Sequence, residues 1–141
     1  REQVLYGAHL AAVAFASAGS GLHHKICHVL GGAYNLPHAQ THATVLPHVL
    51  AFNAPAAPEA QSRLAAAFGA ESAMVGIARL YDMLEAPRAL ADYGMAASDI
   101  DVAAELIDRV VPESNPRSPT TADLAALLQA AQTGDRSRWG L

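Results

Sequence analysis

Six of the seven histidines in this 141-residue chain lie in one segment, residues 21–48. Imidazole is the side chain best suited to bind a metal ion or to transfer a proton near neutral pH. His24 and His28 are four residues apart, so a helix would place them on one face, roughly 6 Å apart along its axis. Two imidazoles in that arrangement can bind one metal ion from the same side. The spacing therefore favours a metal or catalytic site over a set of unrelated packing residues.

A third ligand could come from the next helix. His38 directly follows Pro37, at the start of that predicted helix, and reaches the pair if the two helices pack together. A divalent metal ion needs at least one more ligand, often a carboxylate. The nearest acidic residues, Glu2 and Glu59, belong to other segments. A complete metal site would therefore need a ligand from outside this chain.

The remaining histidines divide into one further candidate and three with structural roles. His42 lies one helical turn after His38 and could face the same pocket. His23 is about 100° around the helix from the next histidine, so we expect a packing or surface position rather than metal ligation. His48 is expected in the packed interior, and His9 against a neighbouring helix.

Composition and charge exclude several classes of protein. Apolar residues make up 52% of the chain and charged residues 16%, which favours a compact domain over disorder. The formal net charge is −4 and the nine basic residues are scattered, so no surface for nucleic acid is expected. The uncharged run over 10–22 is too short to cross a bilayer and no signal peptide is visible, so we expect a cytoplasmic protein without a membrane partner.

The single cysteine, Cys27, excludes an internal disulfide framework and fits a reducing compartment. It lies between histidines on a predicted helix. We interpret it as a small buried apolar residue rather than as a nucleophile.

Helical periodicity runs through nearly the whole sequence, and no segment alternates with period two, so the fold is predicted to be all-α and bundle-like. Pro47 is expected to bend or interrupt its helix, Thr120 or Thr121 to cap the last helix, and the tail 133–141 to be loosely held. The first helix should end at 17–21 and the second should stop at Gly31–Gly32. The later helices are predicted at 38–53, from about 58 to 68–70, and at 71–85, 88–93, 98–111 and 121–133.

The segment GLHHKICHVLGGAYNLPHAQTHATVLPHVLAFN resembles the histidine segment of the iron-containing alcohol dehydrogenase superfamily. The pattern there is G-x-x-H-x-x-x-H-x-L-G, then P-H, then L-P-H and an asparagine. The matching residues are Gly21, His24, His28, Leu30, Gly31, Pro37, His38, Leu46, Pro47, His48 and Asn53. The particular residues of this segment are most similar to those of the maleylacetate reductase branch. The distal NPRSPTTADLAALLQAA, with Asn115, Pro116 and Arg117, resembles the C-terminal end of that branch.

This resemblance implies a domain organisation. Such enzymes have an N-terminal α/β domain that binds a nicotinamide dinucleotide, followed by an all-helical domain, in a dehydroquinate synthase-like fold. Residues 1–141 are expected to be that C-terminal helical domain, which carries catalytic and metal-site residues, without the dinucleotide-binding domain. The first residue is Arg1 rather than methionine, which also suggests a piece of a longer polypeptide.

The resemblance also assigns roles by position. His24 and His38 match metal ligands of the superfamily. His28 matches a histidine that lies beside the nicotinamide and is linked to proton transfer, so it is the first candidate for both cofactor binding and catalysis. His42 stands where the wider family often has asparagine, a feature shared with the reductase branch, and is the second catalytic candidate. That branch often departs from the family's acidic ligand, so a divalent iron or zinc ion is implied without being required.

The implied activity of the full-length protein is reduction of maleylacetate to 3-oxoadipate with NADH or NADPH, in the degradation of aromatic compounds. The implied partners are a small dicarboxylate substrate and a second copy of the protein. The isolated chain is expected to be inactive. Two alternatives stay open at this point: an iron- or zinc-dependent dehydrogenase of a small alcohol, and a non-catalytic helical metal-binding module.

Overall fold

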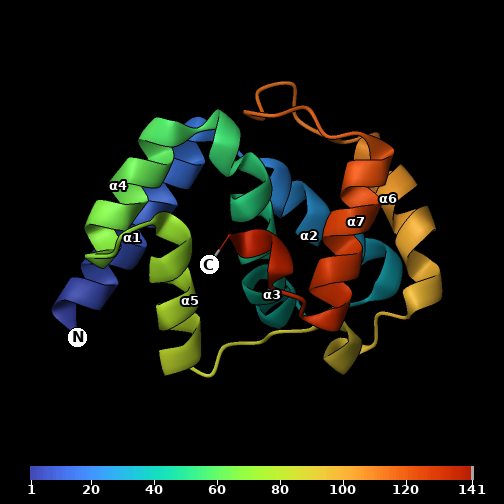
Figure 1. Cartoon of the computed structure of the whole chain (residues 1–141), viewed down its shortest axis with the longest axis horizontal. Coiled ribbons are helices and arrows are strands. Elements are labelled where there is room, and N and C mark those ends of the chain that lie inside the picture. The colour runs from blue at the N-terminus through green and yellow to red at the C-terminus, as the bar shows by residue number, and fades with distance from the viewer. Residues whose placement is uncertain (141) are drawn as a thin grey trace.

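The computed structural model describes residues 1–140, and throughout this range the regular secondary structure is helical (Figure 1). The all-α prediction is therefore confirmed. The α-helices are α1 (Glu2–Ala18), α2 (Leu22–Tyr34), α3 (His38–Asn53), α4 (Pro58–Phe68), α5 (Ala73–Met83), α6 (Ile100–Asp108) and α7 (Thr121–Thr133). Short 3-10 helices lie at Ala54–Ala56 (η1), Leu90–Tyr93 (η2), Ala97–Asp99 (η3) and Ser137–Trp139 (η4).

Helix α3 lies at the centre of the arrangement and contacts α2, α5 and α7. On one side α4 packs on α5, and on the other α6 packs on α7, as Figure 1 shows. The six histidines of residues 21–48 thus lie on α2 and α3, and the other helices pack around this pair.

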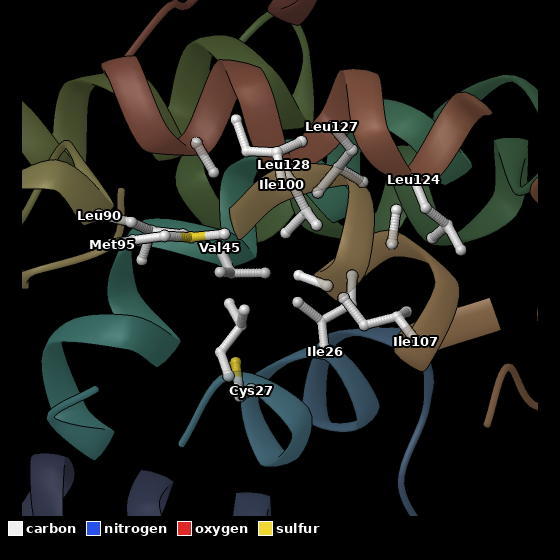
Figure 2. Packing of buried hydrophobic residues seen from close by; sticks show 14 of the residues in the cluster. Ile26, Cys27, Val45, Leu90, Met95, Ile100, Ile107, Leu124, Leu127 and Leu128 are labelled. Carbon is white, nitrogen blue, oxygen red and sulfur yellow. The ribbon is translucent and has the colours of Figure 1, made fainter. Parts of the chain in front are cut away.

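Two apolar clusters fill the interior. The larger one joins α2, α3, α6 and α7, and Figure 2 shows its side chains converging between these helices. Its fully buried members include Ile26, Leu30, Val45, Ile107 and Leu128. The smaller cluster consists of Met74, Ile77, Ala78, Tyr81 and Trp139. Aliphatic side chains and alanine supply most of this core, as a sequence with 6% aromatic residues requires.

Pro47 was expected to bend or interrupt α3; the helix continues through it, and the proline side chain is fully buried. A proline inside a helix removes the hydrogen bond to the carbonyl four residues earlier, which here belongs to Ala43. The hydroxyl of Tyr81, on α5, donates to this carbonyl oxygen at 2.7 Å. A side chain from a neighbouring helix thus satisfies the acceptor that the proline leaves open, and the helix continues.

Helix α2 also continues where the sequence predicted an end. It passes Gly31 and Gly32 and stops at Asn35, which adopts the left-handed conformation at φ 53°. Asparagine tolerates this conformation better than most residues and can take the place of glycine at a helix end. The buried Leu36 follows at once. The predicted helices 71–85, 88–93 and 98–111 are shorter than expected, at Ala73–Met83, Leu90–Tyr93 and Ile100–Asp108.

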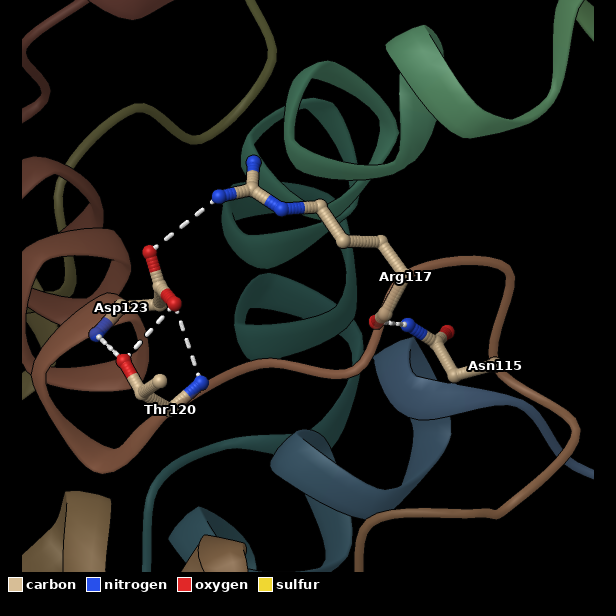
Figure 3. A network of polar contacts seen from close by, with 4 residues as sticks. All are labelled: Asn115, Arg117, Thr120 and Asp123. Carbon is tan, nitrogen blue, oxygen red and sulfur yellow. Dashed lines mark hydrogen bonds and ion pairs between the residues drawn. The ribbon is translucent and has the colours of Figure 1, made fainter.

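The start of α7 follows the prediction. The Thr120 hydroxyl accepts a hydrogen bond from the Asp123 amide at 3.1 Å, and the Asp123 carboxylate accepts one from the Thr120 amide at 3.0 Å. Figure 3 shows this reciprocal cap, in which Asp123 also receives the Arg117 guanidinium at 3.4 Å. Both orphan amides are satisfied by local side chains.

The tail is held more firmly than expected. Trp139 is 5% exposed, and its indole nitrogen donates to Nδ1 of His48 at 3.4 Å. Arg136 stacks on the Trp139 ring and pairs with Asp82 at 3.0 Å. The prediction of a loose tail is therefore wrong for 133–140; Leu141 lies outside the described residues.

Helix α1 differs from the others because none of its residues is buried. Its exposed apolar side chains include Val4, Leu5, Leu10 and Phe15. In the part of the chain that the structure covers, no individual helix combines the length and apolar composition that crossing a bilayer requires. Helices α1 and α2 meet these criteria only as a pair, and they are bent by 92° at their junction.

Candidate functional site: a histidine cluster between α2 and α3

Five histidines gather where α2 packs on α3. His23, His24 and His28 come from α2, and His38 and His42 come from α3. The ring centroids of His24 and His28 are 6.2 Å apart, so the predicted shared helix face is confirmed. The His42 ring lies 4.1 Å from that of His38 and 4.9 Å from that of His24. The two helices therefore bring together all four histidines that were singled out as site residues.

The short connection from α2 to α3 fixes this arrangement. Leu36 is buried behind the turn, and Pro37 has extended geometry before the first residue of α3. The Thr41 hydroxyl donates to the Pro37 carbonyl at 2.8 Å and stabilises the first turn of α3. Because both helices are anchored in the main core, the imidazoles project from rigid elements.

His42 has the most perturbed environment in the cluster. Burial, together with the smaller effects of the neighbouring His23 and His38, lowers its pKa to about 4. Its Nε2 atom is buried without a hydrogen-bond partner. His42 is thus neutral at neutral pH, with a ring nitrogen that is free for a ligand or a proton.

His23 links the two helices. Its Nε2 lies 2.9 Å from the carbonyl oxygen of His42, and since a carbonyl can only accept, this nitrogen carries the proton. Burial lowers the pKa of His23, against the effect of that hydrogen bond. His23 thus packs between the two helices, with an interhelical hydrogen bond that the sequence did not reveal.

His24 is half-buried and stacks on the Phe15 ring of α1, with centroids 4.5 Å apart. Burial lowers its pKa, as do the nearby His28 and His38. His28 and His38 are exposed. The cluster thus has a solvent-facing side and a buried side, and the latter includes His42.

The other two histidines lie outside the cluster. His48 is 5% exposed and packs on Trp139, which confirms its predicted interior position. His9 is exposed on α1, so the expectation that it faces a neighbouring helix is wrong. The reason is that α1 packs on the domain much less than its apolar residues suggested.

Two segments that are distant in sequence meet at the end of α3. The side-chain amides of Asn53 and Asn115 donate to one another, at 3.1 and 2.9 Å. Asn115 also donates to the Arg117 carbonyl oxygen at 2.6 Å (Figure 3). These contacts join the end of the histidine segment to the distal motif, a pairing that spacing in the sequence could not predict.

A separate hollow of about 350 Å³ lies near the tail and is lined in part by His48, Phe52, Arg117, Asp123 and Trp139. The Arg117 guanidinium lies 4.3 Å from the centroid of the Phe52 ring. Since Arg117 already pairs with Asp123 and stacks on an aromatic ring, its position here serves the fold.

Comparison with known proteins gives a consistent result. The profile of the Fe-containing alcohol dehydrogenase family, C-terminal, matches residues 1–132. Maleylacetate reductase 1 of Rhodococcus opacus is 40% identical over 136 residues, which are 96% of this chain and 38% of that protein.

Solved structures agree with the sequence comparison. An iron-containing alcohol dehydrogenase from Corynebacterium glutamicum is 61% identical, with a TM-score of 0.91 over 93% of this chain and 37% of that one. Maleylacetate reductase from Agrobacterium tumefaciens is 43% identical, with a TM-score of 0.76 over 84% of this chain and 33% of that one. The chain spans less than two fifths of the length of the curated relatives it matches.

Proposed function

Because this chain belongs to the iron-containing alcohol dehydrogenase family, of which it forms the C-terminal helical part, we propose that the whole protein is an NAD(P)H-dependent reductase of maleylacetate. The curated relatives described as maleylacetate reductases support this choice of substrate, since they align with almost the whole chain. The substrate is a small dicarboxylate with a keto group, and the product is 3-oxoadipate.

The proposal includes a domain that precedes this one. Residues 1–141 supply the helical half of the active site, and an upstream α/β domain binds the dinucleotide. The length of the relatives supports this, as do the uncovered apolar side chains Val4, Leu5 and Phe15 of α1. The isolated chain is expected to be inactive because half of the cleft would be missing. A homodimer in the cytoplasm is the expected form of the whole protein.

The cluster suits a divalent iron or zinc ion at His24 and His38. The lowered pKa of His24 leaves its imidazole neutral, as ligation requires. Further ligands would come from the upstream domain, because no acidic residue lies near these two histidines in the sequence. A bound divalent ion would stabilise negative charge on a substrate oxygen.

The remaining histidines fit proton transfer. When bound by the upstream domain, a reduced nicotinamide would supply a hydride to one carbon of the substrate double bond, and negative charge would develop on the conjugated keto oxygen. His28, on the same face as His24 and open to solvent, then protonates the adjacent carbon or relays a proton to it. His42 holds the buried end of the histidine cluster and is the second candidate for this step.

The observation that carries the proposal is the convergence of His24, His28, His38 and His42 from two helices. The test is His28→Ala in the polypeptide that includes the upstream domain. We expect kcat to fall about a hundredfold or more, the scale of a lost acid or base, with little change in dinucleotide affinity. Arg63→Ala is the control, since Arg63 is exposed on α4 and outside the cluster.

Thermal melting and kcat are measured on the same preparations. Near-normal kcat in folded His28→Ala would remove His28 from the mechanism and leave His42 as the candidate. No reduction of maleylacetate by the whole protein would overturn the proposed substrate.

A second function rests on the 61% identity with the alcohol dehydrogenase structure. In that case the whole protein would oxidise a small alcohol and require its metal ion. Removal of metal by a chelator separates the two: activity on an alcohol that vanishes with the metal favours the dehydrogenase. If neither substrate class is turned over but metal is bound, the domain is a non-catalytic metal-binding module.

A further inference from the structure

We propose that His23, Cys27 and His42 form a second metal site, for Zn²⁺ or a metal ion of similar softness, distinct from the pair His24 and His38. Neither the composition nor the comparisons assign a role to this set. The proposal does not rest on the proposed enzymatic function, because it concerns binding by side chains of this domain alone.

The geometry is close to what a zinc ion needs. The ligand atoms of His23, Cys27 and His42 all lie within 4.8 Å of one another. In a tetrahedral site with Zn–N near 2.0–2.1 Å and Zn–S near 2.3 Å, ligand atoms are about 3.3–3.8 Å apart. Small changes in side-chain torsion angles would close that difference without moving the helices.

The backbone already provides the spacing. His23 and Cys27 are four residues apart on α2, so they share a helix face, and His42 enters from α3. The hydrogen bond from His23 to the His42 carbonyl holds the two helices at this level. Figure 2 shows Cys27 on α2, among the buried side chains of the larger apolar cluster. Two ligands from one helix and one from its neighbour are thus positioned before any ion binds.

The donor atoms suit a borderline-soft ion. The Nε2 atom of His42 is buried and has no hydrogen-bond partner, which is costly unless a ligand satisfies it. The Nε2 of His23 carries its proton, so the lone pair of Nδ1 is free. One thiol and two imidazoles select zinc or copper rather than magnesium or calcium, which prefer oxygen.

Binding must displace the thiol proton. Burial raises the pKa of Cys27 to about 12, so the metal-free side chain is a thiol and a poor nucleophile. As the zinc–sulfur bond forms, the S–H bond breaks and one proton passes to solvent. A water molecule would complete the tetrahedron.

The test is a titration of the 141-residue chain with Co²⁺, which takes zinc positions and reports its ligands by absorbance. We expect a thiolate-to-cobalt charge-transfer band in the near ultraviolet that saturates at one Co²⁺ ion per chain. Excess Zn²⁺ should abolish this band. Cys27→Ser should remove the band. His23→Ala should weaken Co²⁺ binding by more than about tenfold, since even residues behind the ligands cost that much.

Lys25→Ala is the control, because Lys25 lies on the same helix and outside both sets of proposed metal ligands. It should retain the band, and far-ultraviolet circular dichroism verifies that each variant is folded. A second measurement needs no variant: Zn²⁺ should slow the reaction of Cys27 with a thiol reagent. The proposal is overturned if wild-type protein gives no thiolate band, or if the band survives His23→Ala and disappears in His24→Ala.

Discussion

The hydroxyl of Tyr81 should stabilise α3 only because Pro47 is in that helix. Tyr81→Phe keeps the ring in the smaller core cluster and removes one donor. The Ala43 carbonyl oxygen, which accepts that donor at 2.7 Å, then has neither Tyr81 nor a helical N–H from residue 47. Burial raises the pKa of Tyr81 to about 12, so the hydroxyl donates at every pH of ordinary assays.

The magnitude follows from the loss of one hydrogen bond with a partly covered acceptor. Such a loss costs about 1–2 kcal/mol, less than for a fully buried group because Ala43 is only half-buried. With about 2.1 cal/mol/K of unfolding entropy per residue, that corresponds to a fall in Tm of roughly 3–7 °C for a chain of this size.

The assay is a double-mutant cycle with Pro47→Ala, in which denaturant unfolding gives the stability of each variant. An alanine at position 47 restores the helical N–H, so Tyr81→Phe should cost much less in that background than in the wild type. The packing lost with the buried proline cancels in the cycle. Equal costs in the two backgrounds, or no cost in the wild type, would show that the hydroxyl does not compensate for the proline.

Two further predictions concern the core and the pH dependence of stability. Gly76→Ala should destabilise the fold by about 1–3 kcal/mol, because its new Cβ would lie 2.5 Å from Cβ of Phe68. Gly7→Ala is the control: Gly7 is in open space on a helix, so this change should be neutral or stabilising. Urea titration measures both. Burial lowers the pKa of His48 from 6.5 to about 4, so the unfolded chain binds more protons between these values. The free energy of unfolding therefore has no penalty from His48 above pH 6.5. It decreases as the pH falls toward 4, by about 3 kcal/mol in total. His48→Phe should make the urea midpoint of unfolding depend less on pH over this range. An unchanged pH dependence would contradict the argument.

The sequence predicted best those elements whose ends carry local signals. The bounds of α3 and α7 follow Pro37 and Thr120, which act within one helical turn. Gly31 and Gly32 misled the prediction of where α2 ends, since glycine permits a helix end without requiring one. The continuity of α3 and the burial of Trp139 depend on partners 38 and 91 residues away, so no local pattern could reveal them.

The candidate site shows the same division. The shared face of His24 and His28 follows from helix periodicity, and His42 follows from its turn after His38. The proximity of Cys27 to His42 depends on how α2 and α3 pack, although the four-residue spacing from His23 was visible in the sequence. Roles for His24, His28, His38 and His42 remain predictions until the variants are measured.

Helix α1 has a consequence for how unfolding should be measured. A helix of 17 residues with no buried side chain has little besides its own hydrogen bonds to hold it, whereas most helical stability in proteins comes from tertiary packing. Its helicity should therefore decay with temperature before the core opens, while the buried Trp139 reports the core itself. Far-ultraviolet ellipticity and tryptophan fluorescence would then not coincide, and stability values for this domain belong to the fluorescence transition.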